Sequence, residues 1–260
     1  MKKWIALFLF ALLCTSSILA VAEGNNSLND FSSRLKKKAE VVENVANTAE
    51  QEDENSFGPA VRISDPFYKK VRSSAFLNET DYSKEANIMI ELKNVSGRTL
   101  YPDEVSVTAY NAAGEVIKEE KYSNFGPDMV ENNQSLFVWD WFYGFDVPVA
   151  EINHFEVKVE SETSSYNEYA IIDGQALVSE GVAYALVENT TESDIYGVSA
   201  TIVMENEEGT LLNVTDIAVS NTCGIFPGSV MVLRNNVEDF ANNGKLMEAN
   251  ATAHVLHRLD

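Results

Sequence analysis

One stretch of the chain, residues 88–117, is repeated without a gap as residues 183–212. The two copies are offset by 95 residues, so that Asn94 falls on Asn189 and Gly114 falls on Gly209. Solenoid repeats recur at shorter periods of about 20 to 50 residues. A unit of about 100 residues is instead large enough to bury a core of its own. The offset therefore predicts that one small domain has been duplicated in a chain of 260 residues.

The residues inside the repeat alternate with the period of a β-strand. Ile88, Ile90 and Leu92 are separated by Met89 and Glu91, which predicts a half-buried strand. Further strands are expected at 61–63, 71–77, 105–110, 116–117, 136–143, 155–159, 183–188, 198–205, 211–219, 230–234 and 249–256, with a loop over 78–85. Strands at this spacing, with turn residues between them, favour an all-β fold. We expect two tandem immunoglobulin-like antiparallel β-sandwich domains, residues 60–162 and 163–260.

The N-terminus has the pattern of an export signal. Lys2 and Lys3 precede an apolar run, and Ala20-Val21-Ala22 is a small-x-small cleavage pattern. Residues 1–22 are therefore interpreted as a signal peptide, cleaved after Ala22, of a secreted bacterial protein. Two alternatives are an uncleaved membrane anchor over residues 4–22 and a lipoprotein acylated at Cys14. The polar residues 15–17 interrupt the apolar run, and cleaved secretion is favoured.

Residues 23–59 are expected to form a helical and acidic tether. Apolar side chains recur there at helical spacing, at Leu28, Phe31, Leu35, Val42, Val45 and Ala49. A short coiled-coil seam or a helix packed on a sandwich would give the same pattern. An isolated helix of this length is weakly stable in water, which favours the tether.

The chain is strongly acidic, with 40 acidic and 19 basic residues and a formal net charge of -21. It has no basic patch for nucleic acid, and the only membrane contact expected is through an uncleaved leader. An acidic surface keeps an exported protein soluble or attracts cations and basic partners. With Cys14 in the leader, Cys223 has no partner for an intramolecular disulfide and is expected to be a small buried side chain.

The first repeat also resembles a known family. Asn94-Val-Ser-Gly-Arg-Thr-Leu-Tyr101, followed by residues 105–110 and Asn111-Ala-Ala-Gly114, is similar to the FxLYD-type and related small immunoglobulin-like domains of secreted bacterial proteins. In the second copy Ile195 stands for Leu100, and the resemblance is looser. It implies an extracellular β-sandwich without known catalytic residues.

The segment 137–145 is the most conspicuous candidate site. Along a strand, Phe137, Trp139, Trp141 and Tyr143 share one face, and such a row can stack on sugar rings or hold a peptide. The alternative is that one or two rings fill the core and the others close its end. Large apolar groups on both faces favour burial. Trp139, Trp141 and Tyr143 are the candidate ligand-binding residues.

The sequence nominates no catalytic residue, no metal ligand and no cofactor. His254 and His257 are three residues apart, which places them on opposite faces of a strand. No GxSxG, HExxH or P-loop motif occurs. We expect a secreted, non-catalytic binding or structural module for a protein or glycan at the cell surface. The alternatives are a carbohydrate-binding sandwich that uses strand 137–145 and an extracellular hydrolase.

Overall fold

A computed structural model describes residues 56–164, 168–219, 222–240, 242 and 244–259. The described residues all belong to one compact unit. The expected signal peptide and tether helix lie outside the described residues. No helix of the described part is long and apolar enough to cross a lipid bilayer.

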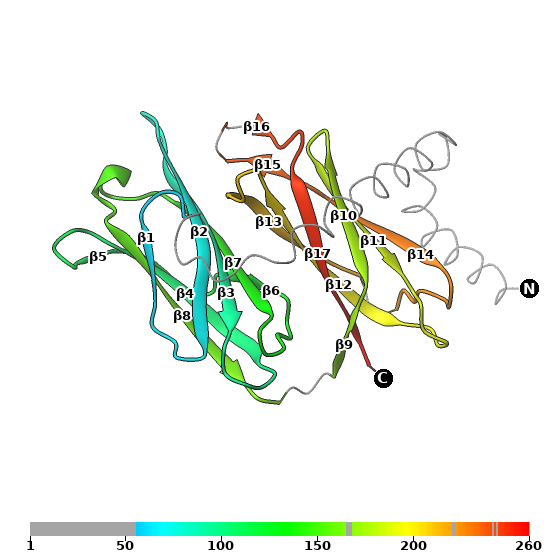
Figure 1. Cartoon of the computed structure of the whole chain (residues 1–260). Coiled ribbons are helices and arrows are strands. Elements are labelled where there is room, and N and C mark those ends of the chain that lie inside the picture. The colour runs from blue at the N-terminus through cyan, green and yellow to red at the C-terminus, as the bar shows by residue number, and fades with distance from the viewer. Residues whose placement is uncertain (1–55, 165–167, 220–221, 241, 243, 260) are drawn as a thin grey trace, which may run out of the picture. The chain divides into compact units, whose positions relative to one another are not determined.

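The first half of the described chain forms two four-stranded sheets around one core (Figure 1). One sheet has the order β1-β8-β4-β5 and the other has the order β2-β3-β7-β6. Their bounds are β1 Ala60–Ile63, β2 Tyr68–Glu79, β3 Lys84–Asn94, β4 Tyr101–Tyr110, β5 Val116–Glu120, β6 Asn124–Gly126, β7 Ser135–Tyr143 and β8 His154–Glu162, with a 3-10 turn η2 at Val149–Glu151. All pairs are antiparallel except β1 with β8.

The second half also has a layered, sandwich-like arrangement, in which the two larger sheets have three and four strands. A three-stranded sheet β10-β11-β14 and a four-stranded sheet β13-β12-β17-β9 enclose a second core. Their bounds are β9 Tyr169–Ile172, β10 Gly174–Ser179, β11 Val182–Glu188, β12 Tyr196–Glu205, β13 Leu211–Ala218, β14 Val230–Asn236 and β17 Asn250–Arg258. A small ribbon joins β15 Glu238–Asp239 to β16 Gly244–Lys245.

Several strand predictions need correction. The loop expected over residues 78–85 is shorter, because β2 continues to Glu79 and β3 begins at Lys84. Strands β6, β9, β10, β15 and β16 were not predicted. Met89 was expected on a solvent-facing side, yet it is only 1% exposed. Cys223 was expected to be buried and is partly exposed.

A buried asparagine organises the loop that follows β3. The Asn94 side-chain nitrogen donates to the backbone oxygens of Arg98 and Val130, at 2.8 and 2.9 Å. Its side-chain oxygen accepts hydrogen bonds from the backbone N–H and the hydroxyl of Ser96, at 2.9 and 2.7 Å. The side chain is fully buried, so these bonds satisfy polar groups that water cannot reach.

The same network occurs in the second half around Asn189. Its side-chain nitrogen donates to the backbone oxygens of Ser193 and Ile225, at 2.8 and 2.7 Å. The backbone N–H and hydroxyl of Thr191 donate to its side-chain oxygen, at 2.9 and 2.7 Å. Each partner lies 95 residues after its counterpart around Asn94.

A third apolar cluster joins the β2-β3-β7-β6 sheet to the β13-β12-β17-β9 sheet. Its buried members are Phe76, Met89, Phe137, Val203, Leu211 and Val214. Because these side chains stand on the faces that point away from the two main cores, both sheets bury apolar groups on both sides. This contact explains why Met89 is buried.

An arginine lies on the same faces as this cluster. Arg72 of β2 donates to Glu91 at 2.7 Å, to the carboxylate of Glu205, and to the backbone oxygen of Gly209 at 2.7 Å. Burial alone would lower the pKa of Arg72, but the two carboxylates outweigh burial and raise it. The guanidinium therefore stays charged and links the two halves.

Candidate functional site

The aromatic row of β7 runs from a buried contact into solvent. The unbroken register of β3 with β7 puts Phe137, Trp139, Trp141 and Tyr143 on one face. Phe137 is 2% exposed in the third cluster, Trp139 is partly buried against that cluster, and Trp141 and Tyr143 are 49% and 66% exposed. The sequence favoured one or two rings in the sandwich core with the others closing its end; Phe137 is instead buried in the third cluster, outside that core, and Trp141 and Tyr143 are exposed.

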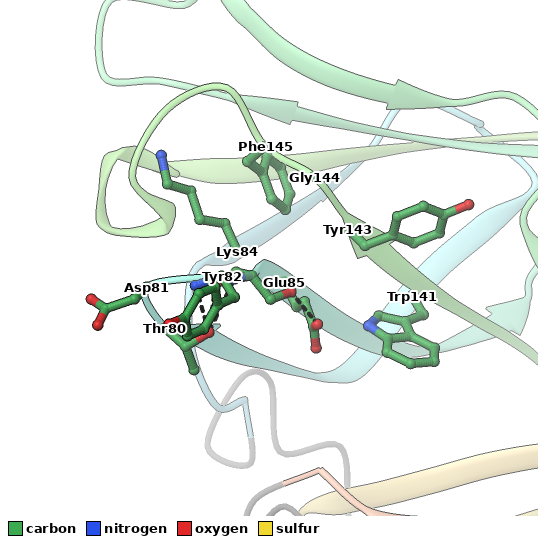
Figure 2. Close-up of a pocket in the computed structure, with 10 residues that line it drawn as sticks. Thr80, Asp81, Tyr82, Lys84, Glu85, Trp141, Tyr143, Gly144 and Phe145 are labelled. Atoms are coloured by element: carbon green, nitrogen blue, oxygen red, sulfur yellow. Dashed lines mark hydrogen bonds between the residues drawn. The ribbon is translucent and has the colours of Figure 1, made fainter.

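The exposed end of the row borders an open depression of about 630 Å³ (Figure 2). Trp141, Tyr143 and the two residues after β7 lie on one side of it. The other side is formed by residues 80–85, the turn between β2 and β3 and the start of β3. Of the three candidate residues, Trp141 and Tyr143 line the depression, and Trp139 is not among its lining residues.

Side-chain hydrogen bonds shape the turn on the far side. The Thr80 hydroxyl oxygen accepts a hydrogen bond from the backbone N–H of Ser83 at 3.0 Å. The backbone N–H of Thr80 donates to the backbone oxygen of Ser83 at 2.7 Å. The Ser83 hydroxyl donates to the carboxylate of Glu85. Glu85 is paired with Tyr143 in the β3–β7 register, which brings its carboxylate to the aromatic row.

The two exposed rings do not lie in one plane. The ring centroids of Trp141 and Tyr143 are 6.4 Å apart and the rings are inclined at 72°. The Lys118 ammonium lies 5.7 Å from the centroid of the Tyr143 ring, a cation–π contact. The depression thus combines aromatic faces with the side chains of Asp81, Lys84 and Glu85.

Sequence reasoning missed the turn residues of this site. Tyr82, which is 98% exposed, and Glu85 fell in the expected loop over 78–85. The signal that could have found them is the spacing of Thr80 and Ser83, because a threonine hydroxyl can close a tight turn. Phe145, which is 5% exposed, also lines the depression.

The remaining titratable groups of the described segments do not have the arrangement that a metal ion requires. Among the described residues, no three or more His, Cys, Asp or Glu side chains gather as they would around a metal ion. His254 lies against Phe137 with ring centroids 5.0 Å apart, and burial lowers its pKa. Burial and the nearby carboxylate of Asp128 raise the pKa of Asp216 to about 6.

Comparison with protein-family models and with curated protein sequences finds no match. Among solved structures, red sea bream transglutaminase is similar at 11% identity and a TM-score of 0.19 over 84% of this chain. This chain spans 33% of the length of that protein. A structure of infectious bursal disease virus, Gx strain, is similar at 10% identity and a TM-score of 0.20, covering 77% of this chain and 70% of that one. At these scores neither likeness bears on function.

Proposed function

We propose that this chain is a secreted, non-catalytic binding module of two tandem immunoglobulin-like domains, and that the exposed end of β7 binds a carbohydrate. The observation that carries the proposal is the half exposure of Trp141 beside a polar depression. A large ring left in water, next to a few polar groups, is typical of a ligand site rather than of a core.

The duplicated domain is supported by the hydrogen bonds of Asn94 and Asn189. Both asparagines are fully buried, and both make the same four side-chain contacts at the same offsets. Export is proposed from the leader pattern of residues 1–22, and the cell-surface setting follows from it.

The chemistry of the depression favours sugar binding. A pyranose has an apolar face that packs on an aromatic ring and a rim of hydroxyls that need hydrogen-bond partners. Trp141 offers the ring face, and Glu85, Ser83 and Asp81 offer carboxylate and hydroxyl groups across the depression. An uncharged polar ligand of this kind would use both sides of the site.

A hydrolase is the less favoured alternative. Glycosidases place two carboxyl groups on either side of the scissile bond. The carboxylates that line this depression, Asp81 and Glu85, both come from the segment 80–85, and the opposite side presents Trp141 and Tyr143. That one-sided arrangement supports retention of a glycan without its cleavage.

Binding of the full chain to an array of glycans, followed by titration of the best ligand, tests the proposal. Trp141→Ala should weaken binding at least about tenfold, or ~1.4 kcal/mol, with little change in melting temperature. Tyr122→Ala is the matched control, because Tyr122 is 82% exposed and does not line the depression. Unchanged affinity in Trp141→Ala, or no glycan bound by the parent chain, would overturn it.

A further inference from the structure

The angle between the two exposed rings restricts the shape of the ligand. Aromatic residues that stack on successive sugars of a flat polymer must present their faces in nearly one plane. Trp141 and Tyr143 are inclined at 72°, with centroids 6.4 Å apart, so they form a corner instead. A corner accommodates one sugar ring and does not match the flat surface of a crystalline polysaccharide.

A cation beside Tyr143 makes Trp141 the better placed ring for stacking. The Lys118 ammonium lies over the Tyr143 ring at 5.7 Å from its centroid, and so occupies one face of the phenol. Trp141 is 49% exposed and borders the depression. The sugar is therefore expected to stack on Trp141, beside Tyr143.

The polar side of the depression selects by charge. Figure 2 shows Glu85 between the side chains of Tyr82 and Trp141. The hydroxyl of Ser83 donates a hydrogen bond to the Glu85 carboxylate. Glu85 and Asp81 are acceptors for sugar hydroxyls, and Lys84 is the cation on the same segment. In a chain of net charge -21, a carboxylate on the ligand would face repulsion from Glu85, from Asp81 and from the protein as a whole.

We infer that the depression is a subsite for a single uncharged pyranose of a soluble glycan, stacked on Trp141 and hydrogen-bonded to Glu85. The inference rests on the proposed carbohydrate binding and adds the ligand class: uncharged rather than acidic, and one ring rather than a planar array. Neutral hexoses and N-acetylhexosamines both fit this chemistry. The experiment below compares the binding of these two classes of sugar.

The test compares four ligands with the full chain: neutral hexose oligosaccharides, N-acetylhexosamine oligosaccharides, uronate oligosaccharides of matched length, and crystalline cellulose. At least one uncharged soluble ligand should bind, with uronates at least about tenfold weaker at low salt and the difference shrinking as salt rises. Affinity should change little between a disaccharide and a tetrasaccharide. The cellulose should retain no protein.

Glu85→Gln supplies the matched variant, because glutamine keeps an oxygen that can accept from Ser83 while removing the charge. It should reduce the ratio of the affinity for uncharged ligands to the affinity for uronates. That ratio would not change if the role of Glu85 were purely structural. Equal or tighter uronate binding, retention on cellulose, or affinity that grows steadily with chain length would overturn the subsite and leave carbohydrate binding intact. Failure of all four ligands to bind would overturn both.

Discussion

The side-chain nitrogen of Asn94 donates a buried hydrogen bond to the backbone oxygen of Val130 at 2.9 Å. The two residues are 36 positions apart in the chain. The bond ties the loop after β3 to the segment that precedes β7, and thereby helps to set the register of the strand that carries Trp141. Its counterpart joins Asn189 to Ile225.

Replacing Asn94 should destabilise the fold strongly. Asn94→Ala removes one of the two donors to the buried oxygen of Val130, which keeps only the Leu100 N–H, and removes the acceptor used by Ser96. We expect a loss of about 2 to 4 kcal/mol in the free energy of unfolding, measured with urea. Asn94→Asp should do no better, because it places a carboxylate against two carbonyl oxygens. Asn111→Ala, in a turn open to solvent, is the control and should cost less.

Two aromatic residues of β7 should separate stability from binding. Phe137→Ala empties a site that is 2% exposed and should cost about 3 to 5 kcal/mol. Trp141→Ala removes a ring that is 49% exposed and should cost much less stability, while weakening glycan binding at least about tenfold. Thermal unfolding of both variants checks the contrast. A loss at Trp141 as large as that at Phe137 would mean that the indole is part of the core.

Gly126 of β6 and Thr201 of β12 should be coupled in stability, because the space for a side chain at position 126 depends on the size of residue 201. A methyl group at Gly126 would overlap the Thr201 side chain, which is 1% exposed. Gly126→Ala should therefore destabilise the protein by about 1 to 3 kcal/mol. Thr201→Ala should restore part of this loss in the double variant, because it removes the atoms that collide. If a double-mutant cycle gave no coupling energy, the two strands would not be in contact in solution.

The ion pairs of Arg72 should stabilise the fold, and a double-mutant cycle should show a coupling energy between Arg72 and Glu205. Arg72→Ala leaves Glu91 and Glu205 without the guanidinium, and we expect a loss of about 1 to 3 kcal/mol. In a cycle with Glu205→Gln, the coupling energy should fall as salt is added, because Glu205 is 31% exposed. A coupling energy of zero at low salt would contradict the link seen between the two halves.

The carboxyl of Asp216 should make stability depend on pH. Partial burial of the group and the neighbouring Asp128 raise its pKa from 3.8 to about 6. A raised pKa in the folded state means that folding favours the protonated carboxyl. Relative to high pH, Asp216 therefore stabilises the protein below pH ~4, and this stabilisation is lost as pH rises through about 6. Asp216→Asn should therefore stabilise the protein at pH 7 and have little effect at pH 4.

Solvent limits the size of that effect, because Asp216 as a whole residue is exposed. Melting temperatures across pH 4 to 7 for the parent and Asp216→Asn make the comparison. Asp128→Asn should give a smaller shift in the same direction. Parallel pH profiles for parent and variant would contradict the assigned pKa.

The local pattern of the chain predicted most of the strands of the two main cores and which of their residues share a face. Ile88, Ile90 and Leu92 point into the first core because side chains in a strand alternate, and this period is written in the sequence. The same rule correctly put Trp141 and Tyr143 on one face. It could not find Tyr82 and Glu85, because the turn that brings them there depends on side-chain hydrogen bonds of Thr80 and Ser83.

Which rings meet water was decided by contacts between distant segments. Met89 and Phe137 are buried because Val203, Leu211 and Val214, more than sixty residues further along the chain, cover that face. Trp141 lies on the same face but is not part of this cluster, and it is half exposed. Periodicity states which side of a strand a residue occupies, whereas burial depends on what is packed against that side, and that requires the tertiary structure.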